Sequence, residues 1–130
     1  IIGHSCGTTD TNYHMNIASG GSYLGFDRFG IAALMPDEDR ADSLMRLIME
    51  GAGDRIVVSH DSVWCWKGEP FPTYAMDQLS EMMEPTRFDR EIIPMLKDRG
   101  ATEEQIEMLV VDNPRRFFSE ETLKPLNSGS

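Results

Sequence analysis

The feature that most constrains the fold is a short apolar run ended by polar residues, which recurs three times with helix-like stretches between. His4 ends the first run, Asp27 and Arg28 end the second, and His60 and Asp61 end the third. The spacing is 23 residues from His4 to Asp27 and 34 residues from Asp27 to Asp61. Such spacings suit consecutive strand–helix units, in which parallel strands present their polar ends at one edge. The sequence therefore predicts an α/β protein with its chemistry at the strand ends.

Local signals predict the elements around these clusters. Asp10 is a candidate N-cap, and Thr102 with Gln105 forms a capping box. We expect strands over residues 1–5, 22–29 and 55–59. We expect helices over residues 11–19, from 37 to a stop at 51, over 74–83 and 88–97, and in further turns between 102 and 118. Residues 120–130 are expected to form a frayed tail.

Composition excludes several classes of protein. The 130 residues are 40% hydrophobic and 26% charged, which is ordinary for one globular domain. The formal charge of −10 argues against binding to nucleic acid or to an anionic membrane surface, and no apolar run reaches the roughly 18 residues that span a bilayer. Cys6 and Cys65 match no disulfide or zinc-finger spacing, which favours a reducing, cytoplasmic setting. The chain opens within an apolar run, so a targeting segment of a longer parent would lie upstream.

His4 and Asp61 are the candidate metal ligands. A strand-end imidazole offers a nitrogen to Zn²⁺, Mn²⁺, Co²⁺ or Fe²⁺, although Gly3-His4-Ser5 alone favours a hydrogen-bonded core histidine. A carboxylate that ends an apolar strand must be paired or metal-bound, and a structural salt bridge is the alternative for Asp61. Three polar strand ends in a row favour a site.

Other residues are candidates for binding substrate. Arg28 could hold an anionic or carbonyl oxygen, or form an internal ion pair. Trp64 and Trp66 could line a substrate pocket or simply pack over the strand ends. His60 is expected to face the opposite side from Asp61, because successive strand side chains alternate.

Several of these motifs together resemble the phosphotriesterase family of the amidohydrolase superfamily. The resemblance spans residues 1–119 without gaps. Its motifs are Gly3-His4-Ser5 with Thr8, Asp10 and Tyr13; Gly25-Phe26-Asp27-Arg28; Pro36-Asp37-Glu38 with Arg40; Ser59-His60-Asp61; and Asn113-Pro114 before Phe117-Phe118.

The resemblance implies an eight-stranded (β/α)₈ barrel, a TIM barrel, of which residues 1–119 would supply strands six, seven and eight. It implies a centre of two divalent metal ions, with zinc expected first and manganese, cobalt or iron as alternatives. His4 would bind the more exposed metal. Asp61 would bind the more buried metal and accept a proton from a bridging hydroxide that attacks an ester-type bond. The remaining ligands, a His-x-His pair, a carboxylated lysine and a further histidine, would lie upstream.

The resemblance also bears on the substrate. Family members with an arginine at the position of Arg28 look like lactonases, which implies a lactone or related ester, and an aryl dialkyl phosphate is the alternative. Gly7 departs from the family, because a carboxylate often stands there and relays protons.

The resemblance further implies that the parent protein is a homodimer. A non-catalytic α/β interaction module is the alternative from another class, and residues 1–130 alone are expected to be unstable and inactive.

Overall fold

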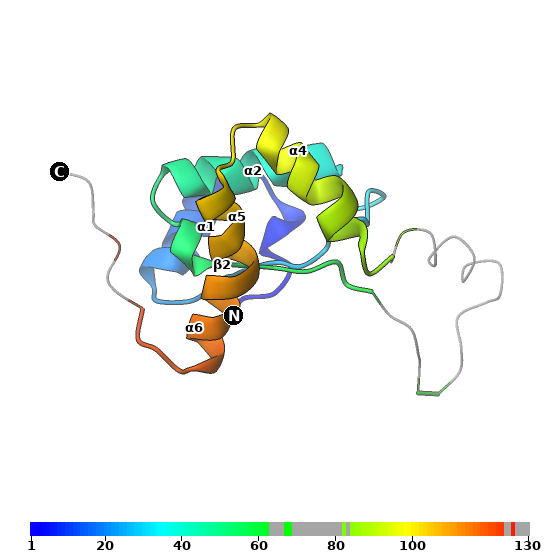
Figure 1. The fold of residues 1–130 in the computed structure, drawn as a ribbon. Helices are drawn as coiled ribbons and strands as arrows, with labels where there is room; N and C mark the ends of the chain where they lie inside the picture. Colours follow the sequence, from blue (N-terminus) through cyan, green and yellow to red (C-terminus); the bar gives the residue numbers. More distant parts are fainter. Residues whose placement is uncertain (63–66, 69–81, 83, 124–125, 127–130) are drawn as a thin grey trace.

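The chain folds into a short parallel sheet covered by helices (Figure 1). A computed structural model describes residues 1–62, 67–68, 82, 84–123 and 126. Its strands are β1 (Leu24–Phe26) and β2 (Ile56–Val58), and its α-helices are α1 (Thr11–Ser19), α2 (Asp37–Met49), α4 (Ile93–Asp98), α5 (Glu103–Glu107) and α6 (Asn113–Phe118). Short 3-10 turns lie at Ser5–Gly7 and Gly53–Arg55, and π-helical turns at Phe88–Ile92 and Met108–Asp112. Within the described residues no helix has the length and apolar character needed to cross a membrane.

The sheet brings three strand ends to one edge. β1 and β2 pair in parallel, with Leu24 opposite Ile56 and Phe26 opposite Val58. Ile2 adds an isolated parallel bridge to Leu24, so the order is Ile2, β1, β2. α1 connects the first two of these segments and α2 connects β1 to β2. The polar residues that follow Ile2, β1 and β2 therefore meet at the carboxyl edge.

The helices begin where their capping residues place them. The Asp10 carboxylate accepts hydrogen bonds from the Asn12 and Tyr13 N–H groups at the start of α1. Thr102 and Gln105 form the complete capping box ahead of α5. These contacts satisfy backbone donors that the first turn of a helix leaves free, and they confirm both predicted helix starts.

Each π-helical turn ends directly before a helix with proline in its first turn. Phe88–Ile92 precedes Ile93-Pro94, and Met108–Asp112 precedes Asn113-Pro114. A proline has no N–H and its ring crowds the carbonyl four residues earlier. The widened turn accommodates the proline without ending the helical path.

The core lies between the sheet and the helices. Side chains from β1, β2, α2, α4 and η4 (Met108–Asp112) are fully buried together; they include Leu24, Phe26, Ile56, Leu44, Leu47, Leu96 and Leu109. The last helix is fixed to the sheet by Asn113, whose Nδ2 donates to the Gly53 and Ile56 carbonyl oxygens at 2.8 and 2.7 Å. The sheet and the C-terminal helices therefore form one packed unit, which fixes the strand ends.

The expected strands are longer than the observed ones. Of residues 1–5 only Ile2 pairs, and of residues 22–29 only 24–26 form β1. The physical reason is Asp27, whose carboxylate accepts the His4 N–H and so takes His4 out of a ladder hydrogen bond. Arg55 belongs to a 3-10 turn, although the Ser59 N–H still donates to the Phe26 carbonyl oxygen at 3.0 Å beyond β2. The helices at 11–19 and from 37 are confirmed, whereas most of the expected helix at 74–83 lies outside the described residues.

Candidate functional site

Asp27 holds His4 at the carboxyl edge of the sheet. Both oxygens of its carboxylate accept the His4 backbone N–H at 3.0 Å, and Oδ1 lies 3.0 Å from the His4 ring nitrogen Nδ1. A carboxylate can only accept, so Nδ1 carries the proton of this bond. In the neutral form of the ring, the lone pair is then on Nε2. Metal-binding histidines have this arrangement, with one ring nitrogen on a carboxylate and the other on the metal.

Two glycines make room for the Asp27 carboxylate. A Cβ placed on Gly25 would lie 3.1 Å from Asp27 Oδ2 and 3.0 Å from the Gly3 Cα, and one on Gly3 would lie 3.3 Å from the same oxygen. These are closer than ordinary carbon contacts. A side chain at either position would push the carboxylate away from His4. The role of Asp27 was missed at the sequence level, and the only signal for it was its place after a strand.

Arg28 reaches from β1 to the end of β2. Its Nε lies 3.5 Å from Asp61 Oδ2, and both side chains are about one-third exposed. Asp27 and Arg28 are consecutive, so the end of β1 connects the other two strand ends: Asp27 contacts His4 and Arg28 contacts Asp61. Three predicted site residues, His4, Arg28 and Asp61, thus lie at one edge. An ion pair was the alternative for Arg28 and a salt bridge the alternative for Asp61, and the structure pairs these two side chains with each other.

His4 and Asp61 share an uncommon backbone conformation. Their φ angles are 59° and 51°, in the left-handed region, and among the described non-glycine residues only Glu120 also has a positive φ. Such angles cost a side-chain-bearing residue free energy and collect at functional sites. The two candidate ligands are therefore held in place at the expense of local backbone strain.

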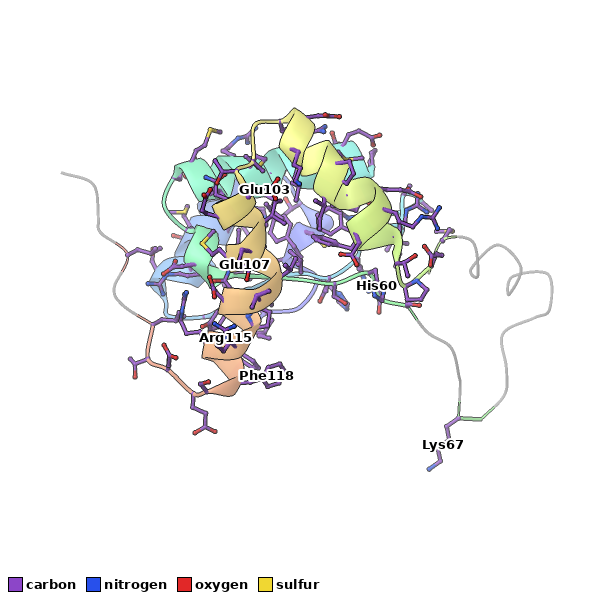
Figure 2. The ribbon with its side chains drawn as sticks, viewed as in Figure 1. His60, Lys67, Glu103, Glu107, Arg115 and Phe118 are labelled. Carbon is purple, nitrogen blue, oxygen red and sulfur yellow. The ribbon has the colours of Figure 1, made fainter. Side chains whose placement is uncertain are left out.

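His60 lies next to the helical layer. It lines a cavity of about 240 Å³ with Phe88, Asp89 and Leu109 from the helical layer, and Figure 2 shows it where the chain leaves β2. Its Nδ1 accepts the Ser62 N–H at 3.2 Å. His60 thus contacts the helical layer, and its predicted alternation with Asp61 stays a prediction.

Cys6 lies close to the site but is kept protonated. Its side chain is fully buried, with Sγ 3.9 Å from Asp27 Oδ1. Burial raises the pKa of the thiol, and backbone hydrogen bonds from Arg28 and Asp27 offset this in part. A thiol is a poor nucleophile compared with a thiolate, so the geometry does not favour Cys6 as a nucleophile.

We expect Cys6 to resist alkylation by iodoacetamide in the folded whole protein at pH 8. Because its pKa is raised, the reactive thiolate fraction at this pH is below that of an ordinary cysteine. Mass spectrometry of the Cys6 peptide, with and without denaturant, measures this. Equal labelling rates in the two states would contradict the burial of this thiol.

These contacts do not test the roles predicted for the site residues. Trp64 and Trp66 lie outside the described residues. Among the residues that the structure describes, no three His, Cys, Asp or Glu side chains form a group that could hold a metal ion. His4 and Asp61 are therefore at most part of a ligand set.

The fold and this edge define a class of protein, an α/β protein of parallel strands with its polar groups at the carboxyl ends. The family follows from comparison: the model of the phosphotriesterase family matches residues 1–118, and the chain belongs to that family. The chain is 36% identical over 118 residues to the phosphotriesterase homology protein of Mycobacterium tuberculosis, covering 91% of this chain and 36% of that protein.

Solved structures give the same result. The organophosphorus hydrolase of Deinococcus radiodurans matches with a TM-score of 0.77 and 38% identity, over 90% of this chain and 36% of that one. A structure described as the engineering of organophosphate hydrolysis from a weak promiscuous lactonase template matches with a TM-score of 0.77 and 38% identity, over 90% of this chain and 38% of its own. The chain is thus a mixed α/β unit spanning about a third of phosphotriesterase structures, which are TIM barrels, and it is homologous to hydrolases.

Proposed function

We propose that residues 1–119 supply strands six to eight of a (β/α)₈ barrel in a metal-dependent hydrolase, and that the carboxyl edge is part of its active site. The observation that carries this proposal is the series of contacts from His4 through Asp27 and Arg28 to Asp61, with both candidate ligands in the left-handed backbone region. In TIM-barrel enzymes the active site is built at this end of the strands. The matched relatives are hydrolases, which supports the same assignment.

We expect two divalent metal ions in the whole barrel, with zinc first, and His4 and Asp61 would each supply one donor atom. His4 would bind through Nε2, because Nδ1 is taken by Asp27. Asp61 would bind through Oδ1, because Oδ2 faces Arg28. One imidazole and one carboxylate suit zinc, manganese, cobalt or iron, and the other ligands would come from the rest of the barrel. When bound, such ions lower the pKa of coordinated water and polarise the substrate oxygen.

Asp61 and Arg28 would then move and orient the reacting groups. With Oδ1 on a metal, Asp61 Oδ2 would accept a proton from the attacking water and return it to the leaving oxygen. The Arg28 guanidinium would orient Asp61, and its remaining N–H groups could donate to the carbonyl or phosphoryl oxygen of the substrate. Both side chains are partly exposed, as residues that meet a substrate must be.

A lactone is the substrate that we favour. Arg28 supports it, because family members with arginine at this position resemble lactonases, and the matched structures include a promiscuous lactonase template. The specific observation in favour of the second candidate, an organophosphate triester, is the match to organophosphorus hydrolases. A non-catalytic interaction module gains no support from either match.

We expect the whole protein to bind about two metal ions and to hydrolyse lactones faster than aryl dialkyl phosphates. The variant His4→Asn should lower the metal content to about one ion per chain. Asparagine tolerates the left-handed backbone of His4 but lacks the imidazole. Metal analysis after gel filtration, paired with both hydrolysis assays, measures this.

The matched control is His60→Asn, because His60 faces the helical layer. This variant should keep the metal content and activity of the wild type. Full metal content in His4→Asn would remove His4 from the ligand set, and a wild-type protein without activity on either substrate would overturn the proposed function.

A further inference from the structure

The segment after β1 is tied to one buried carboxylate. Asp37, only 6% exposed, opens α2, and its Oδ1 and Oδ2 each lie 3.0 Å from the Gly30 N–H that they accept. Gly30 itself has a φ of 99°, which a glycine adopts without strain. The carboxylate thus fixes the chain two residues after Arg28.

The Asp37 carboxylate also lies next to two arginines, Arg40 and Arg87. Arg40, 1% exposed, donates from Nη1 to Asp37 Oδ1 at 2.9 Å and from Nη2 to the Ile31 carbonyl oxygen at 3.1 Å. Arg87, which precedes the turn Phe88–Ile92, places its Nε 3.9 Å from Asp37 Oδ2. Arg40 therefore holds the segment from the α2 side, and Arg87 holds it from the C-terminal helices.

Packing joins the same two parts of the chain. The Phe29 and Phe88 rings meet edge to face at 5.4 Å between centroids. A Cβ on Gly30 would lie 2.5 Å from the Met82 carbonyl oxygen and 3.1 Å from Arg87 Cδ. Met82, Arg87 and Phe88 therefore pack directly on the turn after Arg28, and the contact leaves no room for a side chain at position 30.

These contacts also restrict the backbone of Arg28. The Arg28 carbonyl oxygen accepts the Ile31 N–H at 3.2 Å, so Arg28 belongs to the same turn as Gly30. The Arg28 side chain then reaches Asp61. We propose that Asp37 and Arg87 are positioning residues for Arg28, fixing the turn from which its guanidinium reaches the active-site edge.

This inference rests on the proposed function only in giving Arg28 a substrate to contact. The effect of Asp37 and Arg87 on the backbone turn does not depend on catalysis. Hydrogen exchange reports on the turn and kcat/KM reports on catalysis, so these two measurements distinguish a failure of the positioning from a failure of the proposed function. Arg87 is the residue to change, because its side chain is 27% exposed and its loss is compatible with folding, whereas Asp37 is buried beside Arg40.

The experiment compares Arg87→Gln, Arg28→Ala and the double variant in the whole metal-loaded protein. Hydrogen exchange over residues 28–31 is expected to speed up in Arg87→Gln, and its kcat/KM for a lactone is expected to fall about tenfold. In the Arg28→Ala background the same substitution should change kcat/KM by less than about twofold, because its effect acts through Arg28. Arg87→Lys should restore most of the loss.

Arg99→Gln is the matched control. Arg99 forms an ion pair with Asp42 of α2 and is 25% exposed, so it joins α2 to the C-terminal helices as Arg87 does but away from the turn. It should leave exchange at 28–31 and kcat/KM unchanged. Wild-type exchange in Arg87→Gln, or an equal loss of kcat/KM in both backgrounds, would overturn the proposal. If the wild type hydrolyses no test substrate, the proposed function fails and the exchange result alone decides the positioning.

Discussion

Asp61→Asn is expected to lower kcat of the whole protein by about 10²–10⁴-fold, the loss that follows removal of a general base. Asparagine keeps the size of the side chain and tolerates the φ of 51° at this position, so the backbone turn should survive. An amide does not accept the proton that a carboxylate accepts at neutral pH. The loss should therefore appear in kcat rather than in stability, which paired kinetic and thermal-unfolding measurements distinguish.

Asp112→Asn is the control for this substitution. Asp112 also pairs with an arginine, Arg115, at 3.3 Å and is similarly exposed, but it lies on the helical layer between η4 and α6. Its loss should leave kcat within about twofold of the wild type, as expected for a surface ion pair. If Asp61→Asn behaved like this control, Asp61 would be only the partner of Arg28.

Sequence signals predicted what is decided locally. The capping residue Asp10 and the Thr102–Gln105 box depend on neighbours within three residues, and both appear in the structure as expected. The strand ends were also predicted, because apolar runs with polar ends describe a parallel sheet. His4, Arg28 and Asp61 could thus be chosen as candidates from the sequence, and their assignment as metal-binding and catalytic residues stays a prediction.

Other features depend on contacts that no local pattern encodes. Asp27 and His4 are 23 residues apart, and their contact exists because two parallel segments pair and two glycines leave space between them. The same contact shortens both predicted strands. Arg87 and Asp37 are farther apart still, and a charged residue near a helix start looks like ordinary capping or dipole compensation until the fold buries it.

Arg40→Met is expected to destabilise the whole protein by about 3–5 kcal/mol, the loss typical when one partner of a buried ion pair is removed. The Arg40 side chain is 1% exposed and also donates to the Met35 and Ile31 carbonyl oxygens. Methionine fills the space of the Arg40 side chain but carries no charge. The Asp37 carboxylate then keeps only the hydrogen bond from the Gly30 N–H and the longer contact with Arg87. Chemical denaturation should show a lower midpoint with an unchanged slope.

Two comparisons identify the cause of that loss. Arg115→Met removes an ion pair whose arginine is 67% exposed and should cost no more than about 1 kcal/mol. Asp37→Leu combined with Arg40→Met removes both charges, so it should be less destabilising than Arg40→Met alone. A double variant as unstable as the sum of its single variants would show that the hydrogen bonds to Gly30, Ile31 and Met35, rather than the uncompensated charge, carry the stability. In either case the turn after Arg28 owes its shape to this buried cluster, so stability and the position of Arg28 should change together.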